Sequence, residues 1–132
     1  MPNRRFSSGA CPASTLNFEV SMDFYVVSTE LRQPYEPRAC RVVRRLRSEL
    51  TDSLALVEIE PPLPREIYDT TDGVDWLILA PRHEGESLFP VATWPLPVYI
   101  CRVKNERRPD GDAIASGDLK ILDWGEIRQL AR

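Results

Sequence analysis

The sequence predicts a mostly β fold: a small, partly open barrel or a strongly bent antiparallel sheet of about six strands, with a short C-terminal helix. Three observations support this prediction. Apolar and polar residues alternate from Leu16 to Val27, the period of a strand with one buried face. Most other apolar runs are short and rich in β-branched residues. The 12 prolines interrupt helices and favour short strands joined by rigid loops.

The strands are predicted in six segments, each ended by turn residues or by a change of pattern. Leu54–Ile59 has apolar residues on both faces, and the runs within Asp75–Ala80 and Val98–Val103 are typical of central strands. Gly125 then opens a tail, Glu126–Arg132, whose apolar spacing predicts one or two helical turns. The predicted strands are Leu16–Ser28, Cys40–Arg47, Leu54–Ile59, Asp75–Ala80, Val98–Val103 and Asp118–Trp124.

The segment Arg38–Leu50 fits two patterns. As a helix it gathers its apolar residues on one narrow face, and Pro37 suits a first helical position. As a strand it alternates, except that Arg44 falls on the inward face. The short link through Thr51 to the next strand favours a hairpin. The alternative is an α+β fold in which Arg38–Leu50 is a helix packed on the sheet.

Length and composition limit the class of protein. A chain of 132 residues predicts one domain, here residues 15–132, after a Pro/Ser/Gly-rich flexible segment at residues 1–14. The net charge of −3 provides no overall basic field for nucleic acid or an anionic membrane. The three cysteines form no CxxC pair, which predicts reduced thiols in a cytoplasmic protein. No apolar run approaches the ~18 residues of a membrane span, so we expect no membrane partner.

The loop Pro81–Ser87 is the one place where a general acid or base could act. It holds the single histidine, His83, beside Glu84. An imidazole next to a carboxylate can exchange protons near neutral pH. A small hydrolase or isomerase would also need a nucleophile, and Ser87 and Cys101 are the candidates.

Cofactors and metals are not expected. One histidine cannot supply a two-His-one-carboxylate metal site, and the acidic residues of Asp69–Asp75 lack the spacing of a calcium loop. The sequence contains no GxGxxG, GxxxxGK[ST] or GxSxG motif. We therefore predict no cofactor and no metal ion.

Two patches suit binding. The first is an arginine cluster containing Arg41, Arg44, Arg45 and Arg47, whose side chains could pair with phosphates or carboxylates. The second is a stiff Trp/Pro segment containing Phe89, Trp94 and Leu96. An exposed Trp in a preordered loop is a typical anchor at protein interfaces.

These patches lead to three functional expectations. The first is a non-enzymatic adaptor or inhibitor-type protein that binds a protein partner through the Trp/Pro loop and the arginine cluster. The second is a nucleic-acid-binding module that uses the Arg38–Arg47 cluster. The third is a small hydrolase or isomerase built around His83 and Glu84.

Overall fold

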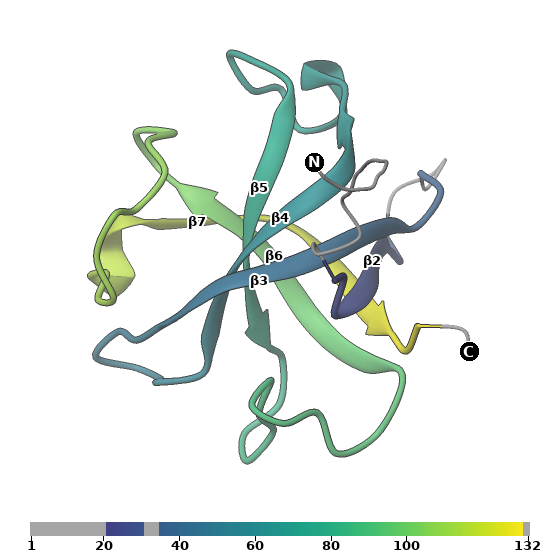
Figure 1. Ribbon diagram of the computed structural model, residues 1–132. Coiled ribbons are helices and arrows are strands. Elements are labelled where there is room, and N and C mark those ends of the chain that lie inside the picture. Colours follow the sequence, from purple (N-terminus) through teal and green to yellow (C-terminus); the bar gives the residue numbers. More distant parts are fainter. Residues whose placement is uncertain (1–20, 31–34, 131–132) are drawn as a thin grey trace, which may run out of the picture.

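The protein is a closed antiparallel β-barrel (Figure 1). The computed structural model describes residues 21–30 and 35–130. Each strand pairs with the next in sequence, and the last pairs with the first to close the barrel. Two single-turn 3-10 helices, η1 (Arg65–Ile67) and η2 (Ser116–Asp118), lie in connections. The strands are β2 (Phe24–Ser28), β3 (Arg38–Leu46), β4 (Leu54–Leu63), β5 (Val74–Pro81), β6 (Leu96–Val103) and β7 (Leu119–Arg128).

The predicted β-rich barrel is confirmed, with closure in place of a partly open arrangement. The first predicted strand, Leu16–Ser28, falls partly outside the described residues, and its described part becomes regular at Phe24. Strand β4 continues past Ile59 to Leu63, although Pro61 and Pro62 lie in its second half. Both prolines lie between Glu58 and Leu63, a stretch of β4 in which no residue pairs with β5. Across the described residues, no helix is long and apolar enough to cross a membrane.

The segment after Pro37 is a strand, so the helical alternative for Arg38–Leu50 is wrong. Strand β3 pairs with β2 on one side and with β4 on the other. The backbone hydrogen bonds of this segment are therefore made to neighbouring strands and not within a helix. A bulge lies between Val42 and Arg44. The extra residue in β3 shifts the alternation of inward and outward side chains by one position. Arg44 therefore pairs with Leu56, whose side chain faces outward. The bulge explains why Arg44 interrupts the strand pattern.

The predicted C-terminal helix is also wrong, because strand β7 runs through Gly125 to Arg128. Its last residues pair with β2, with Val26 opposite Ile127. Ile127 is fully buried in the barrel interior, as a strand facing the core requires. A helix here would leave one edge of β2 and one edge of β6 unpaired, which is unfavourable for both. The end of the predicted helix, residues 131–132, lies outside the described residues.

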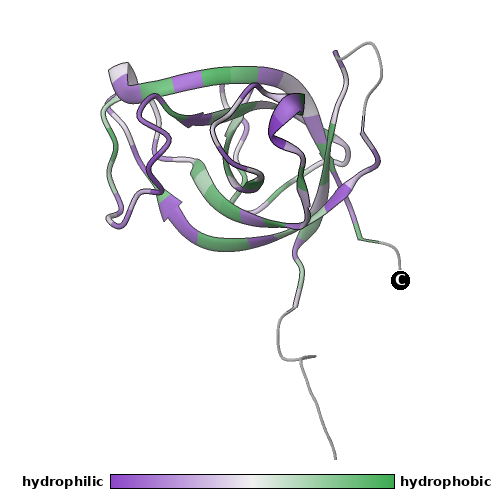
Figure 2. Ribbon diagram, turned by 90° about the horizontal axis from the view of Figure 1, so that it is seen from above, coloured by the Kyte–Doolittle hydropathy of each residue, from purple (hydrophilic) through white to green (hydrophobic). Residues whose placement is uncertain are grey.

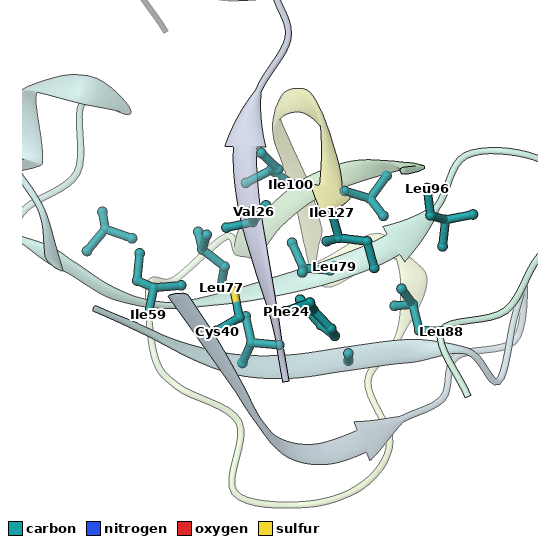
Figure 3. Close-up of a cluster of buried hydrophobic side chains, with 14 of the residues drawn as sticks. Phe24, Val26, Cys40, Ile59, Leu77, Leu79, Leu88, Leu96, Ile100 and Ile127 are labelled. Carbon is teal, nitrogen blue, oxygen red and sulfur yellow. The ribbon is translucent and has the colours of Figure 1, made fainter. Parts of the chain in front are cut away.

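The barrel interior is filled by alternate residues of all six strands (Figure 3). Phe24, Ile59, Leu77 and Ile100 point into this cluster from four strands. The alternation of hydrophobic and hydrophilic residues is visible along the ribbon in Figure 2. Burial of these apolar side chains is the main favourable contribution to folding.

A second apolar cluster lies on the outer face of β4, β5 and β6. It contains Leu54, Leu56, Trp76 and Ile78, the neighbours in sequence of the interior residues. Ile114, from the connection between β6 and β7, packs against it. These strands are therefore buried on both faces, as their continuous apolar runs predict.

Gly125 lies where β7 meets β2 with too little space for a side chain. A Cβ at this position would overlap the carbonyl oxygen of Val27 and lie 2.7 Å from Ile100 Cδ1. We expect Gly125→Ala to lower the free energy of unfolding by about 3 kcal/mol, because backbone must move to admit the methyl group. Urea unfolding followed by circular dichroism measures this loss.

The control for this variant is Gly117→Ala, where a Cβ has nothing within 4 Å. It should change the free energy of unfolding by less than about 0.5 kcal/mol. Equal losses in the two variants would show that the tight approach at the closing seam does not limit stability.

Candidate binding surfaces

The connection at residues 104–118 brings together arginines that are far apart in sequence. It lies against the end of the β3–β4 hairpin, where the Arg47 N–H donates to the carbonyl of Asp112 at 3.0 Å. The Ile114 N–H donates in return to the carbonyl of Arg47 at 2.9 Å. In Figure 1 this connection and the β3–β4 hairpin extend to the same side of the barrel. Arg107 and Arg108 thus lie near the arginines of β3.

Arg41 and Arg108 share one carboxylate. Both guanidinium groups bond to Glu58 on β4, Arg108 to Oε2 at 2.8 Å and Arg41 to Oε1. The hydrogen bond from Arg108 is the largest cause that holds the pKa of Glu58 below its usual value. Burial opposes it, and the hydrogen bond from Arg41 lowers the pKa further. Two positive charges face one negative charge, so this group keeps a net charge of +1.

Arg44 is held by neutral acceptors. Its Nη1 donates to the carbonyl oxygens of Pro109 and Gly111, both at 3.1 Å. These bonds fix the side chain between the strand and the connection without neutralising its charge. Among the described residues, no carboxylate lies within ion-pair distance of Arg44.

Arg45, one of the arginines predicted to bind a partner, contacts the Trp/Pro loop. It pairs across the sheet with the inward Ala55, so it points to the end of the barrel that the 82–95 loop covers. Its guanidinium lies over the ring of Phe89, 5.0 Å from the centroid. Its Nε donates to the carbonyl of Asp52 at 2.8 Å, and its Nη2 is 3.6 Å from the Asp52 carboxylate.

The rest of the Trp/Pro loop packs toward the core. Leu96 is only 3% exposed and belongs to the interior cluster. Trp94 is half-buried, with its ring 6.3 Å from that of Phe24. Ser53 ties the loop to the β3–β4 turn, since its Oγ accepts from the Leu88 N–H at 3.0 Å and lies 3.1 Å from Ser87 Oγ. Phe89 and Trp94 remain partly accessible, whereas Leu96 offers no surface.

The residues of the predicted acid–base site are not brought together. His83 and Glu84 are exposed, and Ser87 bonds to Ser53. Cys101 is buried in the outer apolar cluster, where desolvation raises the pKa of its thiol to about 12. A thiol held neutral in this way is a poor nucleophile. Within the described ranges 21–30 and 35–130, no group of three or more His, Cys, Asp or Glu side chains could hold a metal ion.

Sequence reasoning missed an aromatic surface on β6 and β7. Trp124 is 45% exposed and meets Tyr99 edge to face, and Arg82 lies 4.9 Å from the centroid of its indole. Ile121, on the same strand, is 55% exposed. The irregularity between Ile100 and Cys101 in the β6–β7 pairing places it outside.

The shared carboxylate predicts a pH-dependent contribution to stability. Because the pKa of Glu58 is lowered in the folded state, its ion pairs stabilise the protein above the unfolded pKa, and this contribution is lost as pH falls through the folded pKa. Glu58→Gln should lower the free energy of unfolding by about 1 kcal/mol at pH 7 and by much less in acid, below the lowered pKa of Glu58. Thermal melts across this range measure the difference.

Glu84→Gln is the matched control for this prediction, since Glu84 is exposed and the structure gives its side chain no bond. It should leave stability unchanged at both pH values. A pH-independent loss in Glu58→Gln would attribute its effect to packing and not to charge.

Comparison with protein-family models, with curated proteins and with solved structures finds no match to this chain. A proposal for its function therefore depends on the chemistry of its own surfaces.

Proposed function

We propose that the protein is a non-enzymatic interaction protein that binds an acidic segment of a protein partner. The contact surface is the arginine face, which we define as Arg41, Arg44, Arg107 and Arg108. Among the described residues, Arg44 bonds only to main-chain carbonyls. This observation carries the proposal, because the guanidinium is held in place while its charge is not neutralised.

The surrounding charges are positive on balance and support an acidic partner, although Asp110 lies between the two residues that accept from Arg44. Arg41 and Arg108 share Glu58, and Arg107 is exposed with no side-chain bond given by the structure. The chain as a whole has a net charge of −3, so this positive surface is a local departure from its average. Guanidinium groups held in place by hydrogen bonds lose little side-chain entropy when they bind a carboxylate.

The predicted Trp/Pro loop has a smaller part in this proposal. Arg45 lies on the other face of β3 from Arg44, and its cation–π contact with Phe89 connects the strand to the end of the barrel. Phe89 and the half-buried Trp94 can extend an interface begun by the arginines. Arg47, which is exposed, lies at the same end of β3.

The test uses a fluorescein-labelled peptide of alternating aspartate and glycine at low ionic strength, followed by fluorescence anisotropy. Arg44→Gln combined with Arg107→Glu should weaken binding by about tenfold or more, because two of the four charges are removed or reversed. The control is Arg65→Glu, which repeats the charge reversal of Arg107→Glu at an exposed position of η1.

Three results would contradict the proposal. One is equal binding of a matched asparagine–glycine peptide, and another is equal weakening in the Arg65→Glu control. The third is tighter binding of labelled single-stranded DNA or RNA that falls steeply with salt and is lost in the double variant. That result would assign the arginine face to phosphates instead.

A further inference from the structure

A second surface, which shares no residue with the arginine face, is a pocket beside Trp124. It is a shallow depression of about 360 Å³, open to solvent, that lies where β7 passes the residues that follow β2. The Thr29 N–H donates to the carbonyl of Trp124 at 3.0 Å and sets the position of the neighbouring Glu30. The pocket is lined by Glu30, Ile121, Leu122, Asp123 and Trp124.

Asp123 is a buried carboxylate with neutral partners. Its side chain accepts from the Tyr68 hydroxyl at 3.0 Å and from the Trp124 N–H at 2.8 Å, and the residue is only 7% exposed. The Tyr68 hydroxyl lies 3.1 Å from that of Tyr35. Burial raises the pKa of both phenols, that of Tyr35 to about 12, so they remain neutral donors at physiological pH.

No cation of the described part of the chain pairs with Asp123. Arg38 approaches the group only through Tyr35, with its guanidinium 5.7 Å from the centroid of that ring. A buried carboxylate without a cation is unfavourable, and each of its oxygens has a second lone pair available. The site is therefore suited to a positive group supplied from outside.

The other lining residues indicate which positively charged group would fit. Ile121 and Trp124 provide apolar surface that is 55% and 45% exposed, and Glu30 adds a second, exposed carboxylate. An aliphatic stem can lie along the apolar wall while a guanidinium meets the carboxylates and the indole. Arg82 already lies over Trp124, but it is not among the residues that line the pocket.

We propose that this pocket binds an arginine side chain of a protein partner, held between Asp123, Glu30 and the indole of Trp124. Charge complementarity selects this occupant over a neutral apolar side chain, because both polar groups in the lining are carboxylates. The inference is independent of the acidic partner proposed for the arginine face.

The test is a titration of the ¹⁵N-labelled protein with a capped Gly-Gly-Arg-Gly-Gly peptide, following the Trp124 indole N–H by NMR. The matched peptide has citrulline in place of arginine, which keeps the shape and removes the charge. We expect a saturable shift with the arginine peptide and binding about tenfold weaker with citrulline.

Variants separate the pocket from the rest of the surface. Glu30→Gln, at an exposed position that should not affect folding, should weaken binding of the arginine peptide by about fivefold, and Asp123→Asn by more. Glu84→Gln is the control and should bind as the unmodified protein does. The double variant of the arginine face should also keep this binding, so the two proposals fail separately.

Three outcomes would overturn the inference. One is a lack of saturable shift at about 10 mM peptide, a concentration that detects even weak contacts. Another is equal binding of the citrulline peptide, which would assign the pocket to a neutral occupant. The third is unchanged binding in both Glu30→Gln and a folded Asp123→Asn protein.

Discussion

The pairing of β7 with β2 is the interaction on which the rest of the structure depends. It joins the first and the last described strand and gives every strand of the barrel a partner on each side. Gly125 permits the close approach of the two backbones, and Ile127 fills the interior beside Val26. Closure also holds Thr29 against Trp124, which forms the pocket at Asp123.

The second constraint is that β4, β5 and β6 are apolar on both faces. An outward cluster that includes Leu56 and Ile78 must be covered, and residues 104–118 provide part of that cover through Ile114. The route of this connection fixes Arg44 to two of its carbonyls and brings Arg108 to Glu58. The arginine face is thus a consequence of covering an apolar surface.

The two proposed surfaces carry opposite charges on different parts of one barrel. Basic side chains gather where β3 meets the 104–118 connection, and carboxylates gather in the pocket beside Trp124. Each has a charge for which the described residues provide no ion-pair partner, a guanidinium at Arg44 and a carboxylate at Asp123. Two such sites would allow one small domain to bring together partners of unlike charge.

Local pattern by itself determined the β class and the approximate place of most strands, because alternation and β-branched residues act within a few neighbouring positions. It left Arg38–Leu50 open between a helix and a strand. Only the tertiary structure decided that the tail after Gly125 is strand, that the bulge directs Arg44 outward and Arg45 toward Phe89, and that Asp123 is buried beside Tyr68. The physical reason is register: a shift of one residue between strands reverses which side chains face the core, and that shift is set by partners distant in sequence.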